Sequence, residues 1–162
     1  MQSSELHAFV ELHIEQGPLL ERDNQQIGIV SAIAAPAALR IVFRGDGGHA
    51  GALLMPDRND AGLAAAELAL AVEAATLDTG VADTVGTTGR VILEPNAVNS
   101  VPRVASLEID VRDIDLKRRD GVLKQIERAA KSIAARRKVA WEMETISRDP
   151  PATCGQQVHC TR

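Results

Sequence analysis

Aromatic residues are almost absent from this sequence. Only 2% of its 162 residues are aromatic, as two phenylalanines, one tryptophan and no tyrosine. Proteins that bind nucleic acid by base stacking need aromatic side chains and carry a basic surplus, whereas this chain has a formal net charge of −4. We therefore expect no nucleic-acid partner. Alanine, valine, leucine and isoleucine must form the core, which favours helices layered on a sheet.

Long apolar runs are also missing. No segment approaches the ~20 apolar residues of a membrane-spanning helix. The first residues lack the basic and apolar regions of a signal peptide. We expect no membrane association, and the sequence leaves the cellular compartment open.

Cysteine is scarce, and its two copies, Cys154 and Cys160, lie close to the end of the sequence. They either form a disulfide or remain as reduced thiols, and we favour the thiols. His159 lies beside them, but three candidate ligands without a second cluster make a weak zinc site.

The spacing of apolar residues predicts an α+β fold. A first helix is expected to start at Ser3-Ser4 and to end at Gly17-Pro18, where glycine suits a left-handed cap. A polar turn and then the main elements should follow: extended segments 27–35 and 37–44 separated by Pro36, strands 85–93, 104–111 and 139–146, and helices 60–77 and 115–137. This order predicts a split βαβ, ferredoxin-like domain, with a four-stranded antiparallel sheet and two helices on one face.

Both long helices are expected to be amphipathic. The predicted apolar face of helix 60–77 consists of Leu63, Ala66, Leu70 and Ala74. That of helix 115–137 consists of Val122, Ile126, Ala130 and Ile133.

Taken singly, the polar residues that could carry chemistry have ordinary explanations. His13 could be a partly buried histidine, and the glycines of segment 45–51 could simply form a turn. That segment lacks the lysine and the spacing of a phosphate-binding loop. Asn99 could be a turn residue, and Arg112 could pair with Asp110 on the surface.

Taken together, the order and the sequence of these motifs are more informative. The sequence resembles the amidase/hydantoinase/carbamoylase family of zinc aminoacylase-like hydrolases, and most closely its ureidoglycolate- and allantoate-hydrolysing members. The resemblance covers residues 5–153 and is carried by HIEQGP at 13–18, GDGGHAG at 45–51, MPDRND at 55–60, NSVP at 99–102 and DVRD at 110–113.

The resemblance implies a role for each matching residue. His13 corresponds to a metal ligand, and Gln16 to a residue that faces the substrate. His49 corresponds to a catalytic histidine that reaches into the active site of the neighbouring subunit. Asn99 and Arg112 correspond to residues that hold the substrate's amide and carboxylate. The implied reaction is metal-dependent hydrolysis of a linear C–N bond in a ureido or carbamoyl carboxylate, such as ureidoglycolate or allantoate.

The resemblance also implies two divalent ions, manganese or zinc, and a homodimer formed through a lid domain. Residues 1–26 would be a remnant of the catalytic domain, 27–147 the lid and dimerisation domain, and 148–162 a loose tail. The family's His-x-Asp and Glu-Glu ligand motifs and its final histidine ligand do not occur in the sequence. We therefore expect no amidohydrolase activity from this chain alone. N-carbamoyl-L-amino-acid hydrolysis and a purely dimerising, non-enzymatic module remain as alternatives.

Overall fold

The computed structural model describes residues 10–154. The chain divides into two compact units, Met1–Ser31 and Ala32–Arg162. This boundary falls after Ser31, whereas the sequence placed it after Gln26.

In its described part, residues 10–31, the first unit has a short helix, α1 (Leu19–Arg22), in place of the expected polar turn. Residues 10–16 have no regular secondary structure, so the prediction of a helix over them is wrong; the start of that predicted helix lies outside the described residues. Val10, an apolar residue of that predicted helix, is 91% exposed. It therefore buries little apolar surface in the described part of this unit, and a short helix needs such burial to be stable.

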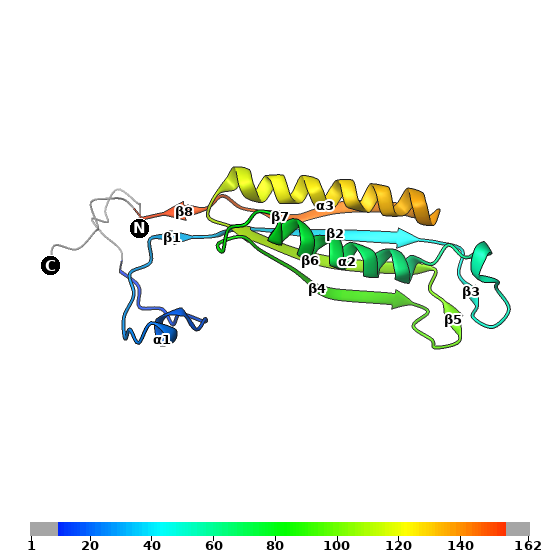
Figure 1. Ribbon diagram of the computed structural model, residues 1–162, viewed down its shortest axis with the longest axis horizontal. Helices are drawn as coiled ribbons and strands as arrows, with labels where there is room; N and C mark the ends of the chain where they lie inside the picture. The colour runs from blue at the N-terminus through cyan, green and yellow to red at the C-terminus, as the bar shows by residue number, and fades with distance from the viewer. Residues whose placement is uncertain (1–9, 155–162) are drawn as a thin grey trace, which may run out of the picture. The chain divides into compact units, whose positions relative to one another are not determined.

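The second unit has the predicted split βαβ fold. Its four-stranded sheet has the order β4-β6-β2-β7, and all neighbours are antiparallel. The strands are β2 (Ala35–Arg44), β4 (Val85–Glu94), β6 (Val104–Asp113) and β7 (Ala140–Arg148), and the helices α2 (Ala61–Leu77) and α3 (Leu116–Arg137) run along the sheet (Figure 1).

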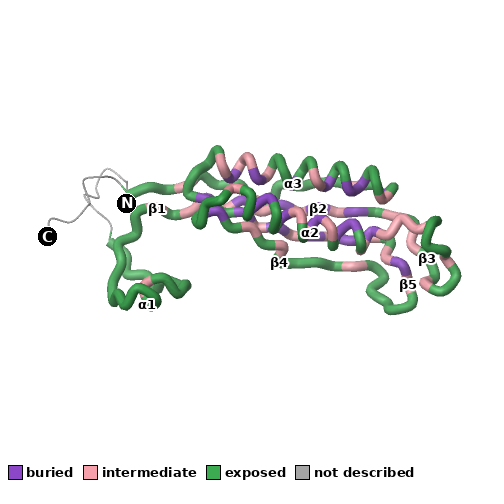
Figure 2. The backbone as a smooth tube through the Cα atoms, viewed as in Figure 1, coloured by how far each residue is buried: buried purple, intermediate pink, exposed green. Residues whose placement is uncertain are grey.

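The core lies between the two helices and one face of this sheet. Alternate residues of the central strands are buried, and the other residues of β2 and β6 form the open face (Figure 2). The buried set comprises Ala37, Leu39, Ile41 and Phe43 on β2, and Ala105, Leu107, Ile109 and Val111 on β6. Period-two burial of this kind follows from the alternation of side chains along a strand.

Aspartate caps both helices. The Asp60 side chain accepts from the Leu63 N–H at 3.1 Å, and the Asp115 side chain accepts from the Arg118 N–H at 2.9 Å. These bonds satisfy amide donors that a helix start leaves unpaired. On α3 the predicted apolar face, Val122, Ile126, Ala130 and Ile133, is buried.

The predicted face of α2 is wrong. The residues that face the core are Ala61, Ala64, Ala65, Leu68, Val72 and Ala75. Leu63, Leu70 and Leu77 are instead 44%, 67% and 71% exposed. Alanine lets the helix approach the sheet closely, and because apolar residues occur all round α2, periodicity could not distinguish its faces.

The sequence suggested that Pro36 separates two extended segments. In the structure it lies within the continuous strand β2. β7 pairs with β2 only from Ala37 onward. Pro36 can therefore lie in the strand without removing an N–H from the ladder between β2 and β7. Its carbonyl accepts from the Asp149 N–H at 3.0 Å.

Two short ribbons extend the sheet at opposite ends (Figure 1). At one end β1 (Ala32–Ile33) pairs with β8 (Ala152–Thr153), so residues up to 153 are not the loose tail expected from the sequence. At the other end β3 (Gly48–His49) pairs with β5 (Ser100–Val101). Among residues 10–154, no helix combines the length and apolar character needed to cross a bilayer.

Candidate functional site

His49 and Asn99 are brought together by the ribbon of β3 and β5. His49 pairs with Ser100 across the ribbon, and the Ala50 N–H donates to the Asn99 carbonyl at 2.8 Å. Both residues are exposed. The structure thus places two of the predicted site residues, one from each side of α2 in the sequence, on one projecting loop cluster.

The glycine-rich segment before His49 is held in place by close contacts. A Cβ atom on Gly45 would lie 1.9 Å from the Asn59 carbonyl oxygen, so only glycine fits there. The Asp46 N–H donates to the Asn59 side-chain oxygen at 2.9 Å, and the Asn59 amide donates to the Asp46 carboxylate at 2.6 Å. Gly47 adopts a φ of 69°, which favours glycine. This segment is therefore a shaped support for His49.

Arg58 adds a second support that the sequence reasoning missed. Its guanidinium donates to the Ala50 carbonyl at 2.6 Å and to the Leu53 carbonyl at 3.0 Å. The residue belongs to the MPDRND stretch, which follows the glycines and includes the 3₁₀ turn η2 (Met55–Asp57). An arginine just after an exposed glycine loop was the available signal, but sequence alone does not show which carbonyls it binds.

Arg112 lies at the opposite end of the sheet from His49. It is opposite Pro36 in the register of β2 and β6, whereas Arg44, at the His49 end of β2, is opposite Val104. Eight residue steps separate Pro36 from Arg44, which corresponds to about 27 Å along the strand. Arg112 is therefore not brought together with His49 and Asn99 within one chain.

Arg112 lines a hollow of about 470 Å³ on the open face of the sheet. Its Nε atom donates to the Asp110 carboxylate at 2.7 Å, so the surface pair considered from the sequence is present. Among residues 10–154, the Arg112 side chain forms this one hydrogen bond, through Nε. Its two Nη atoms have no hydrogen-bond partner in the same described part of the chain. A guanidinium held at Nε keeps its outer fork for a planar anion such as a carboxylate.

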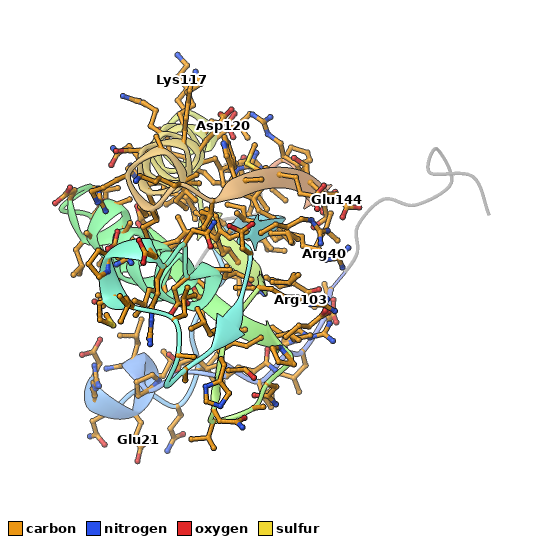
Figure 3. The ribbon with its side chains drawn as sticks, turned by 90° about the vertical axis from the view of Figure 1, so that its right-hand side faces the viewer. Glu21, Arg40, Arg103, Lys117, Asp120 and Glu144 are labelled. Atoms are coloured by element: carbon orange, nitrogen blue, oxygen red, sulfur yellow. The ribbon has the colours of Figure 1, made fainter. Side chains whose placement is uncertain are left out.

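An ion-pair network crosses the open face between the two ends of the sheet. Arg40 binds Glu144 at 2.8 Å, and Figure 3 shows these two residues. Arg40 also binds Glu108 at 2.9 Å, and Arg90 binds Glu108 at 3.3 Å. The hydrogen bond from Arg40 lowers the pKa of the Glu108 carboxyl. The network pairs Arg40 and Arg90 with glutamates, whereas Arg112, which also lines the hollow, is paired with Asp110 through Nε.

A buried pair anchors the end of β6 next to Arg112. Asp113 is fully buried and accepts from Arg118 Nε at 2.7 Å, from the Thr84 hydroxyl at 2.6 Å and from the Asp115 N–H at 2.8 Å. Burial raises the pKa of the Asp113 carboxyl, but these hydrogen bonds outweigh burial and the net shift is downward. The pair holds the end of β6 against the start of α3.

His13 and Gln16 belong to the first unit, and both are exposed. The Nδ1 atom of His13 lies 2.5 Å from the Ile14 carbonyl oxygen, a geometry in which Nδ1–H donates and Nε2 keeps a lone pair. The left-handed residue of the motif is Gln16, with a φ of 58°, rather than Gly17. The Glu15 carboxylate accepts from the Leu19 N–H at 2.8 Å and so caps α1, instead of being a free solvated residue.

The donors that could hold a metal are sparse in the described residues. His13 presents the tautomer that suits a metal ligand, with Nδ1 bonded to a backbone carbonyl. Across residues 10–154, no three histidine, cysteine, aspartate or glutamate side chains gather as a metal site. His159 and Cys160 lie outside the described residues, so the cysteine interpretation stays a prediction. The described residues offer one suitable ligand and do not form a two-metal centre.

The second unit matches a known domain family. Residues 36–138 match the family model described as the peptidase dimerisation domain. The ureidoglycolate hydrolase of Oryza sativa subsp. japonica is 54% identical over 159 residues, which is 98% of this chain and 33% of that protein. The chain thus spans about a third of the length of this relative.

Solved structures give the same result. The crystal structure of AtUAH in complex with glyoxylate superposes with a TM-score of 0.86 at 56% identity, covering 90% of this chain and 35% of that one. An amidase of the hydantoinase/carbamoylase family from Burkholderia multivorans superposes with a TM-score of 0.83 at 30% identity, covering 87% and 34%. The chain therefore belongs to the peptidase dimerisation domain family, in the form carried by amidases of the hydantoinase/carbamoylase type.

Proposed function

We propose that this chain is the substrate-covering and dimerising part of a metal-dependent amidohydrolase that cleaves a C–N bond in ureidoglycolate or a similar ureido carboxylate. The observation that carries the proposal is the 54% identity to a ureidoglycolate hydrolase over 98% of the chain. The geometry of the lid supports it, because the candidate site residues are exposed at the two ends of one rigid sheet.

Arg112 suits the carboxylate of such a substrate. Its Nε atom is fixed by Asp110, which leaves the two Nη atoms as a planar pair of donors. Bidentate pairing with a carboxylate needs this fork, and lysine cannot reproduce it. Arg112 therefore selects substrates that carry a carboxylate beside the bond to be broken.

His49 and Asn99 suit the ureido end of the substrate. Both are exposed on the ribbon of β3 and β5, where a ligand can approach them. An imidazole N–H can stabilise the negative charge that develops on a carbonyl oxygen during attack, and a carboxamide can pair with a ureido group. These residues would bind and polarise the group that is cleaved.

One chain cannot apply Arg112 and His49 to the same small substrate, because about 27 Å of strand separates their ends of the sheet. A second copy resolves this separation. If the free edges of two β4 strands pair antiparallel about a twofold axis, the His49 end of one lid lies toward the Arg112 end of the other. We propose that each site takes Arg112 from one chain and His49 and Asn99 from its partner.

The surface of the second unit fits such a dimer. β4 is an edge strand, since only β6 pairs with it in the sheet formed by the described residues. The exposed leucines of α2, at positions 63, 70 and 77, recur every seven residues and lie on the helix that covers β4. An unpaired edge beside an apolar helix stripe is the pattern of a surface that pairs with a copy of itself.

Two divalent ions, if present in the complete enzyme, would polarise the substrate's oxygen and activate water. Here His13 is the candidate ligand, with its Nε2 lone pair available. The role derived for this chain's other residues is binding and orientation.

A graft tests the proposal. Residues 10–154 would replace the corresponding third of the Oryza sativa ureidoglycolate hydrolase, and ammonia release from ureidoglycolate, allantoate and an N-carbamoyl-L-amino acid would be compared. We expect turnover of ureidoglycolate above the other two. A folded, metal-loaded graft that prefers a carbamoyl amino acid would favour that alternative, and one that is inactive on all three would support a purely dimerising module.

A further inference from the structure

We propose that Arg58 is a positioning residue that holds the loop after His49 so that its imidazole is fixed as the Nε2–H tautomer, a hydrogen-bond donor. The catalytic use of that donor rests on the proposed function. The fixing of the tautomer does not, because it follows from contacts inside the loop.

The loop closes directly after His49. The His49 carbonyl accepts from the N–H groups of Ala52 at 3.1 Å and Leu53 at 3.0 Å, which turns the chain back on itself. This turn brings residue 51 under the imidazole. A Cβ atom on Gly51 would lie 3.3 Å from His49 Cε1 and 3.5 Å from Nδ1. Glycine at this position therefore lets the ring lie against the backbone.

The backbone then selects the tautomer. The Gly51 N–H donates to His49 Nδ1 at 3.1 Å, so Nδ1 must carry a lone pair. A neutral imidazole has one protonated nitrogen, and in this geometry it is Nε2. The opposite tautomer would direct an Nδ1 proton at the Gly51 proton. The exposed atom that His49 offers to a ligand is therefore a donor and cannot accept a proton.

Arg58 keeps the turn closed. Its Nη2 atom donates to the Ala50 carbonyl at 2.6 Å and to the Leu53 carbonyl at 3.0 Å, and its Nε atom also donates to Leu53 at 3.0 Å. These carbonyls flank Gly51 on both sides. The planar guanidinium reaches both at once, which a single ammonium group does less well. Loss of Arg58 would free the segment that carries the Gly51 N–H.

A donor at Nε2 fits one chemical task and excludes another. It can hydrogen-bond the oxygen of a ureido carbonyl and bind it more strongly as negative charge develops. It cannot serve as the base that takes a proton from water, since that task needs a lone pair at the exposed nitrogen. We assign His49 the first task.

Long-range ¹H–¹⁵N spectroscopy of the ¹⁵N-labelled chain reads this tautomer directly. Spectra would be recorded near pH 8, above the usual imidazole pKa of about 6.5, and His49→Gln would identify the His49 signals. We expect the wild-type ring to show a protonated Nε2 and a bare Nδ1. In Arg58→Ala the ¹⁵N shifts of the two ring nitrogens should move toward the averaged values of an unfixed ring. The shifts in Arg58→Lys should lie between those of the wild type and those of Arg58→Ala.

Arg90→Ala is the matched control, because Arg90 is paired on the open face of the sheet, away from the loop. It should leave the His49 signals unchanged. The amide spectrum of β2 and β6 reports whether each variant is folded. The proposal is overturned if wild-type His49 carries its proton on Nδ1, a result that needs no variant, or if folded Arg58→Ala keeps the wild-type pattern.

The grafted enzyme gives a second reading. There Arg58→Ala should lower kcat by about tenfold to a hundredfold with a smaller change in KM, because the donor is misplaced while Arg112 still binds the carboxylate. An equal loss with Arg128→Ala, which changes an exposed arginine of α3, would contradict the positioning role. If the graft is inactive, the proposed function fails, while the tautomer spectrum still decides the role of Arg58.

Discussion

Arg112 and His49 lie at opposite ends of the sheet within one chain: Arg112 is opposite Pro36 at the start of β2, while His49 lies beyond the end of β2. A strand of ten residues holds them apart, and the buried core beneath that strand makes the separation rigid. Two functional ends on one sheet call for two substrates, or for two copies that share each substrate. The proposed sharing of each site between two copies is based on this separation.

Replacing Arg112 in the grafted enzyme should affect substrate capture more than other open-face substitutions do. We expect Arg112→Lys to lower kcat/KM for ureidoglycolate by about tenfold to a hundredfold, because one ammonium group cannot pair with both carboxylate oxygens. Arg44→Lys, at a surface ion pair with Glu142 on the same face but outside the hollow, is the control and should change it little. Equal effects of the two substitutions would remove Arg112 from the site.

The exposed stripe of α2 should control the oligomeric state of this chain. Leu70 is 67% exposed at the centre of the stripe, so Leu70→Glu should leave the fold intact and convert a dimer to a monomer in sedimentation velocity. Leu116→Glu changes an exposed leucine at the start of α3 and should leave the dimer in place. A wild-type chain that stays monomeric at high concentration would rule out this interface.

Asp113 should make the fold sensitive to acid. Its pKa is lowered in the folded chain, so the stabilisation is complete above the unfolded carboxyl pKa of about 3.9 and is lost as pH falls through the lower folded value. Asp113→Asn should reduce the free energy of unfolding by about 3–5 kcal/mol near neutral pH, since it leaves Arg118 without its partner.

Urea unfolding near pH 7 and near pH 3 measures this effect. The difference between wild type and Asp113→Asn should shrink at the lower pH, because the carboxyl is then mostly protonated in the unfolded chain and folding with an ionised Asp113 becomes less favourable. Asp110→Asn removes an exposed partner of Arg112 and should cost less than about 1 kcal/mol at either pH. A constant gap for Asp113→Asn would mean that shape, not charge, accounts for its contribution.

The chain by itself should release no ammonia from ureidoglycolate in the presence of manganese or zinc. Its described residues offer one candidate ligand, His13, and a dinuclear centre needs several. The control is the grafted enzyme under the same conditions. Turnover by the purified chain at a rate comparable with the graft would show that the metal site forms from residues assigned here to other roles.

The sequence predicted the parts of the fold in which local pattern and tertiary environment agree. Strand β6 alternates between buried and less buried residues, and helix α3 buries its predicted face, which includes Ile126. The face of α2 could not be found in this way. Alanine and leucine occur on all sides of that helix, so the spacing of apolar residues does not distinguish its faces. The side that faces the sheet is set by the close packing of small residues.

The candidate site was also predicted only in part from the sequence. The motifs gave His49, Asn99 and Arg112 as candidates, but the register of β2 and β6 places Arg112 at the other end of the sheet from His49 and Asn99. The support from Arg58 was missed because it acts through backbone carbonyls, and any residue could supply those. The helix expected before Gly17 is absent from residues 10–16, where apolar residues such as Val10 are exposed and stabilise no helix by burial.

A mixed dimer tests the shared site most directly. Two grafted chains with different affinity tags, one carrying His49→Ala and the other Arg112→Ala, would be co-expressed, and the heterodimer would be purified through both tags. Each homodimer should be nearly inactive. The heterodimer has one site with both native residues, so it should recover roughly half of the activity of the unsubstituted graft. A heterodimer no more active than the two homodimers would contradict sharing and place His49 and Arg112 in the same chain's site.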